Sequence, residues 1–68
     1  MAMAVVQIIA VTTSEIGASG PIKKFYAVGL ETRALALEEI ERRLKPGEVA
    51  NWTDARDLTL KPGEVRLI

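Results

Sequence analysis

The side chains of this chain that can do chemistry are carboxylates, amines and guanidinium groups, because the sequence contains neither histidine nor cysteine. Histidine is the usual general base at neutral pH, and the familiar serine and cysteine triads also need it. Glu38, Glu39 and Glu41 cluster beside arginines, which favours ionised surface groups over an acid–base pair with shifted pKa values. The sequence therefore predicts no catalytic residue and no enzyme activity.

Metal and cofactor sites are not indicated either. Structural zinc sites use thiolate and imidazole ligands, which this chain lacks. The segment 17–21 is rich in small residues, but it has no Lys-Ser/Thr ending and leads into a predicted strand, unlike a phosphate-binding loop. Four further acidic residues lack the spacing of a calcium loop and are expected to be turn and cap residues. These are Glu48, Asp54, Asp57 and Glu64.

The segment Lys23 to Tyr26 combines two cations with two aromatic rings, an arrangement that can hold phosphates while bases stack. Alternation along a strand, however, places Phe25 and Tyr26 on opposite sides. Nine basic residues balance nine acidic ones, so the chain has no general attraction for nucleic acid. Weak nucleic-acid binding is therefore the alternative function. Its candidate contacts are Lys23, Lys24, Arg42 and Arg43.

Large apolar side chains in polar surroundings are candidates for a protein interface. Trp52 lies between Asn51 and Thr53, where it either anchors an interface or, as we favour in so small a domain, closes one end of the core. Leu35 falls on the polar side of a predicted helix. The candidate interface residues are Phe25, Tyr26, Leu35 and Trp52.

The elements that must position these residues begin with two strands. Residues 4–12 are rich in valine and isoleucine, residues 13–21 are dominated by turn formers, and residues 22–30 contain Ile, Phe, Tyr and Val without a helical stripe. This pattern predicts an N-terminal β-hairpin. On the second strand the small residues Ala27 and Gly29 share a side, which we expect to accommodate close contact with a helix.

One amphipathic helix is predicted to follow, from an N-cap at Thr32 to Leu44, with Pro46 and Gly47 ending it. Its apolar side is predicted to contain Ala34, Ala36, Leu37, Ile40 and Leu44. Its polar side contains three acid-first pairs four residues apart. These are Glu38 with Arg42, Glu39 with Arg43, and Glu41 with Lys45.

The hexapeptide Leu-Lys-Pro-Gly-Glu-Val occurs twice, at residues 44–49 and 60–65. Proline followed by glycine suits the centre of a type II turn, so we interpret the repeat as one turn used twice. Val65 and Leu67 alternate with charged residues and predict a terminal strand. Residues 53–57 are compatible with either a strand or a short helical turn capped by Thr53.

The predicted fold is a single small two-layer α+β domain over residues 1–68, with ββαβ-like order. The first strand is apolar on both faces, whereas one helix covers one face. The C-terminal segment, a second copy of the chain or a different protein must cover the other. Because 68 residues without disulfides form a marginal core, the leading hypothesis is a non-enzymatic interaction module that forms a homodimer.

The segment Met1 to Val11 lacks the basic start of a secretory signal, so a cytoplasmic location is expected. No apolar run approaches the roughly 20 residues that span a bilayer, and no membrane partner is expected.

Overall fold

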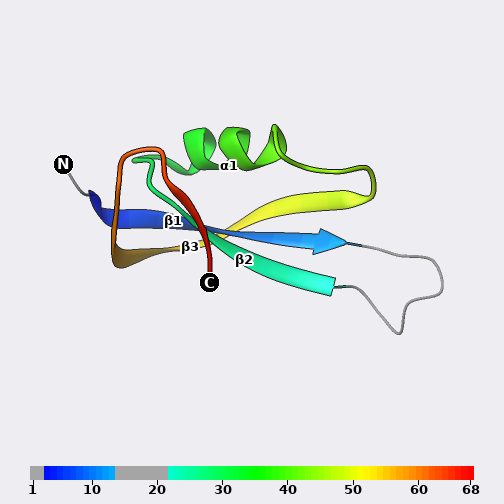
Figure 1. The fold of residues 1–68 in the computed structure, drawn as a ribbon, viewed down its shortest axis with the longest axis horizontal. Helices are drawn as coiled ribbons and strands as arrows, with labels where there is room; N and C mark the ends of the chain where they lie inside the picture. Colours follow the sequence, from blue (N-terminus) through cyan, green and yellow to red (C-terminus); the bar gives the residue numbers. More distant parts are fainter. Residues whose placement is uncertain (1–2, 14–21) are drawn as a thin grey trace.

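The computed structural model describes residues 3–13 and 22–68 of the chain. One four-stranded antiparallel sheet carries a single helix on one face, which confirms the predicted two-layer α+β class (Figure 1). The elements are β1 Met3–Thr13, β2 Ile22–Val28, α1 Arg33–Glu41, β3 Glu48–Leu60 and β4 Val65–Leu67.

The strand order is β3-β1-β2-β4, so β1 lies inside the sheet with a neighbour on each side. The predicted hairpin is confirmed, because Gln7 is opposite Val28 and Thr13 is opposite Ile22 in an antiparallel register. A strand that is apolar on both faces suits this interior place, where every residue from Val6 to Val11 is buried.

Helix α1 begins as predicted, since the Thr32 hydroxyl accepts a hydrogen bond from the Leu35 N–H at 3.2 Å. It ends at Glu41, three residues earlier than expected. The N–H groups of Arg43 and Leu44 instead donate to carbonyls three residues back, at 2.9 and 3.4 Å. This tightening is a common way to satisfy the last carbonyls of a helix.

The predicted apolar side of the helix is correct except at its first residue. Ala36 and Ile40 are buried, and Leu37 and Leu44 are partly buried against the same core. Ala34 is exposed. Only Ala34 of this set faces water, whereas Ala36 in the same turn is buried.

Strand β3 runs without interruption from Glu48 to Leu60, so residues 53–57 form a strand rather than a helical turn. Its pairing with β1 changes register at two points, between Met3 and Val5 and between Ile8 and Ile9. At the second point Ile8 is opposite Asp54 while Ile9 is opposite Trp52. Thr53 is the extra residue of this β-bulge. Cross-strand pairing with β1 therefore decides between the strand and the helical turn that the local sequence left open.

The two copies of the hexapeptide form the same turn, as predicted. Gly47 and Gly63 have positive φ angles of 87° and 78°, which glycine adopts without strain. In the first copy the Glu48 N–H donates to the Lys45 carbonyl at 3.0 Å, and in the second the Glu64 N–H donates to the Lys61 carbonyl at 2.9 Å. A strand begins after each turn.

The end of β3 closes the face of the sheet away from the helix. It turns round the end of the sheet before the chain returns as β4 beside β2 (Figure 1). Leu60 thereby joins Val6, Ile8 and Ala27 in a second buried cluster. Of the three candidates for covering this face, the C-terminal segment is the one found here.

Gly29 has a different role from the one expected. A Cβ atom at Gly29 would lie 2.4 Å from the Lys61 carbonyl oxygen, so the residue makes room for the second turn and not for the helix. Ala27 also faces away from the helix, within the cluster that contains Leu60. The helix lies instead over the side of β2 that carries Tyr26 and Val28.

Candidate interaction surface

Two pairs of apolar side chains lie where β2 runs beside β4, one pair on each face of the sheet. Tyr26 is opposite Leu67 in the register, and Tyr26 packs against the helix-side core. The Ile68 N–H donates to the Phe25 carbonyl at 3.0 Å, and the side chains of these two residues lie on the other face of the sheet. Phe25 and Ile68 line a shallow hollow there with Arg56. We call Phe25, Tyr26, Leu67 and Ile68 the β4 edge patch.

Much of the β4 edge patch is open to water. Leu67 is 59% exposed, Ile68 48% and Phe25 38%. Within the described part of the chain, β4 is the last strand of the sheet and pairs on one side only. An apolar surface beside an open strand edge is a typical template for pairing with another chain.

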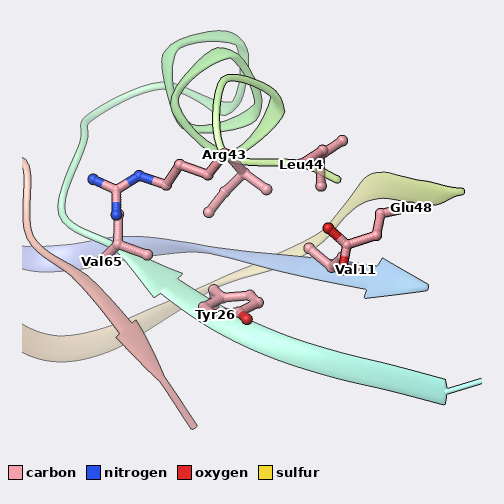
Figure 2. A pocket seen from close by; sticks show the side chains of 7 residues that line it. Val11, Tyr26, Arg43, Leu44, Glu48 and Val65 are labelled. Carbon is pink, nitrogen blue, oxygen red and sulfur yellow. The ribbon is translucent and has the colours of Figure 1, made fainter. Parts of the chain in front are cut away.

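A cavity of about 210 Å³ adjoins the patch on the helix side. Figure 2 shows Arg43 extending from the turn after α1 toward Val65, above the ring of Tyr26. Glu48 lies beside Val11 across the cavity. The Glu48 carboxylate accepts hydrogen bonds from the Lys45 N–H at 2.6 Å and the Thr13 hydroxyl at 3.2 Å. Because these bonds hold it in place, Glu48 is a structural group of the turn.

Two opposite charges lie on β4 and the turn before it. The Glu64 carboxylate accepts hydrogen bonds from the Lys61 N–H at 2.9 Å and from the Arg66 guanidinium at 2.8 Å. Two hydrogen bonds lower the pKa of Glu64 below its usual range. The bond from the Lys61 backbone has the larger effect, and the bond from Arg66 has the smaller one. Glu64 is therefore held as an anion beside a cation at the edge of the sheet.

The opposite edge of the sheet, formed by β3, is less suited to pairing. The bulge at Thr53 breaks the regular ladder, and Asp54 forms an ion pair with Arg56 at 3.0 Å. Hydrogen bonds from the Thr53 hydroxyl, which has the larger effect, and from Arg56 lower the pKa of Asp54. Bulges and charges are the features that protect edge strands from other chains.

The structure separates the four candidate interface residues. Phe25 and Tyr26 belong to the β4 edge patch. Leu35 is 50% exposed on α1. Trp52 lies on β3 and packs against the helix-side core. Its indole N–H donates to the Gln7 side-chain oxygen at 2.7 Å, and the Arg33 guanidinium carbon lies 4.6 Å from the ring centroid. Closing the core is therefore the role that Trp52 has in this structure.

The four candidate anion contacts are also divided. Lys23 and Lys24 are adjacent on β2, and alternation sends their side chains to opposite faces. Arg42 and Arg43 both form ion pairs with Glu39, at 2.5 and 3.2 Å. The predicted pair of Glu39 with Arg43 is thus present, and Glu39 uses its second oxygen on Arg42.

Among residues 3–13 and 22–68, no three acidic side chains gather into a possible metal site. The four acids considered from the sequence lie apart, with Glu48 and Glu64 bound to their own turns. Asp54 is held by Thr53 and Arg56.

Sequence reasoning missed three features of this region. It did not predict that the glutamate of each hexapeptide accepts a hydrogen bond from the backbone N–H of the lysine in the same hexapeptide, although the exact repetition was a usable signal. It did not include Leu67 and Ile68 among the interface residues. It also gave no role to Gln7, whose polar side chain within the apolar run 4–11 was the available signal.

Comparison with protein-family models, with curated proteins and with solved structures finds no match for this chain. In the residues that the structure describes, no helix is long and apolar enough to cross a membrane.

Proposed function

We propose that this chain is a non-enzymatic protein-interaction module that self-associates as a homodimer through the β4 edge patch. The observation that carries the proposal is the exposure of Leu67 and Ile68 beside a strand edge that pairs with no other strand among the described residues. Burying these side chains against a partner removes apolar area from water, which is the main favourable contribution to protein association.

The cavity beside the patch fits a partner's side chain better than a small ligand. Its volume of about 210 Å³ is below the roughly 300–1,000 Å³ of typical ligand pockets. Its charged groups are already bonded within the chain, Arg43 to Glu39 and Glu48 to Thr13. We also propose the cytoplasmic location that the sequence predicts. If the partner at this edge is not a second copy of the chain, the alternative is a different protein.

Light scattering across a range of protein concentrations tests the proposal. We expect a mass that rises with concentration from one chain toward two. The variant Leu67→Asp places a charge in the patch, where burial against a partner is unfavourable, and we expect it to stay monomeric over the same range.

The matched control is Leu35→Asp, which changes a similarly exposed leucine on α1 and should leave the association unchanged. A wild-type chain that stays monomeric at every concentration contradicts self-association. Equal weakening by both variants contradicts the assignment of the association to β4.

Nucleic-acid binding through Lys23, Lys24, Arg42 and Arg43 remains the alternative function, with less support from the geometry. Lys23 and Phe25 share the face away from the helix, as stacking on a sheet requires. Arg42 and Arg43, however, are bound to Glu39. Salt-dependent binding to mixed RNA or DNA would favour this alternative.

A further inference from the structure

We propose that the partner at the β4 edge is a second copy of this chain, paired antiparallel so that Val65 lies opposite the partner's Val65. This inference rests on the proposed function and deepens it by naming the strand register. The backbone groups of β4 that point away from β2, and the charges beside them, support a second copy of the chain as the partner.

The hydrogen bonds to β2 identify which backbone groups of β4 are free. The Glu64 carbonyl accepts from the Gly29 N–H at 2.8 Å, and the Ile68 N–H donates to the Phe25 carbonyl at 3.0 Å. Backbone groups alternate in direction along a strand. Those of Val65 and Leu67 therefore point away from β2, toward the open edge.

A twofold dimer can place one of three residues on its axis. Val65 or Leu67 on the axis gives a central hydrogen-bonded pair, and Arg66 on the axis gives a central non-hydrogen-bonded pair. These three registers differ in which side chains face one another, so the charges at the edge distinguish them.

Only the register centred on Val65 pairs opposite charges. It puts Glu64 opposite the partner's Arg66, and the symmetry repeats this pair. Both pairs lie at non-hydrogen-bonded positions, where the Cα atoms are about 4.5 Å apart and side chains are close. Together with the Glu64 to Arg66 pair within each chain, at 2.8 Å, four charges alternate in sign around a ring.

The other two registers lose this complementarity. Centring on Arg66 places it directly against the partner's Arg66, and like charges opposite each other are destabilising. Centring on Leu67 places Arg66 opposite the partner's Ile68, which leaves each charged side chain without an opposite charge across the strands.

The Val65 register also extends the apolar surface. A twofold axis perpendicular to the sheet keeps both α1 helices on the same face. The Val65 side chains, which lie on the helix side of β4 with Tyr26, then meet across the axis, and Leu67 lies opposite the partner's Gly63. The two four-stranded sheets become continuous through their β4 edges.

Single cysteines test the register, because the chain has no cysteine of its own. Val65→Cys, Leu67→Cys and the exposed control Leu35→Cys are each equilibrated in a glutathione redox buffer, and the disulfide-linked dimer is quantified under denaturing conditions. In the proposed register the residues at 65 have Cα atoms about 5.5 Å apart. Those at 67 are about 14 Å apart, beyond the roughly 7 Å limit for a disulfide.

We expect at least tenfold more linked dimer for Val65→Cys than for either other variant. Linking mainly by Leu67→Cys, or mainly in a mixture of Val65→Cys with Leu67→Cys, overturns the register. Linking of all three variants only at the control level, while light scattering still gives a dimer, overturns pairing through β4 but leaves self-association standing. A monomeric wild-type chain removes the proposed function itself.

A charge exchange provides a second readout that does not depend on the packing of Val65. Glu64→Arg and Arg66→Glu each set like charges opposite each other in the homodimer. A mixture of the two variants restores opposite charges at both positions. We expect the mixture to associate at least fivefold more tightly than either variant alone. A mixture no tighter than its components overturns the register.

Discussion

Gln7 is the residue on which three parts of the fold depend. It is buried in β1, and its side-chain oxygen accepts the Trp52 indole N–H from β3 at 2.7 Å. Its side-chain N–H group donates to the Glu31 carbonyl, just before α1, at 3.3 Å. One amide therefore satisfies a buried donor and a carbonyl at once, as buried polar groups require.

Replacing Gln7 with leucine is expected to destabilise the chain by about 1–3 kcal/mol, because it leaves the indole N–H and the Glu31 carbonyl without a partner. Urea unfolding measures the loss. Trp52→Phe should also destabilise, but the double variant should lose less than the sum of the two, since both changes remove the same hydrogen bond. Additive losses would contradict a shared contact.

At the scale of the elements, α1 shows how local signals define a short helix. The N-cap at Thr32 follows from a side-chain oxygen next to an unsatisfied N–H, a contact within four residues that sequence reasoning can identify. The two Pro-Gly turns are local in the same way. The helix end at Glu41 was not predicted, because it depends on how residues 42–47 reach the start of β3.

The helix cap gives a prediction of its own. Thr32→Ala removes the acceptor of the Leu35 N–H, and we expect a loss of about 1 kcal/mol in unfolding free energy. Thr32→Ser keeps the hydroxyl and should remain within a few tenths of the wild-type value. Guanidinium unfolding followed by far-UV circular dichroism provides the measurement. Equal losses for both variants would show that the hydroxyl is not the stabilising group.

Residues 53–60 mark the limit of sequence reasoning about elements. Thr53 and Asp54 are good capping residues, and nothing local favours a strand over a helical turn. Their strand conformation comes from pairing with β1, 46 to 50 residues earlier in the chain, where Val6 is opposite Arg56 and Ile8 is opposite Asp54. Contacts of such separation are not visible in local propensity.

At the scale of the whole molecule, the second turn and the end of β3 decide what remains exposed. They bury Val6 and Ile8 within one chain, so the apolar strand faces that first suggested a dimer are largely covered. Leu67 and the following Ile68 are among the apolar side chains that remain exposed, and they lie beside Glu64 and Arg66 at the β4 edge. The sequence therefore predicted the candidate site only as an excess of apolar residues. Its location could not be predicted without the strand order, which puts β4 at an edge of the sheet.

Acid should weaken the association through Glu64. The Lys61 N–H and Arg66 lower the pKa of this carboxyl in the folded chain, so any stability it contributes is fully present above its unfolded pKa of about 4.3. That contribution is lost as the pH falls through the lower folded value. Because the proposed register uses the same anion against the partner's Arg66, the dimer dissociation constant should stay nearly constant while the pH is above that unfolded value and should rise as the pH falls through the lower folded pKa of Glu64.

Sedimentation measurements across this range follow the dissociation constant, with circular dichroism confirming that the protomer stays folded. Glu64→Gln serves as the control, because it keeps a side-chain oxygen for the Lys61 N–H and has no charge to lose. Its association should be weaker at pH 7 and change much less on acidification. An equal acid response in the control would show that another carboxyl causes the effect, such as Asp54, whose pKa is also lowered. It would contradict a role for Glu64 in the dimer contact.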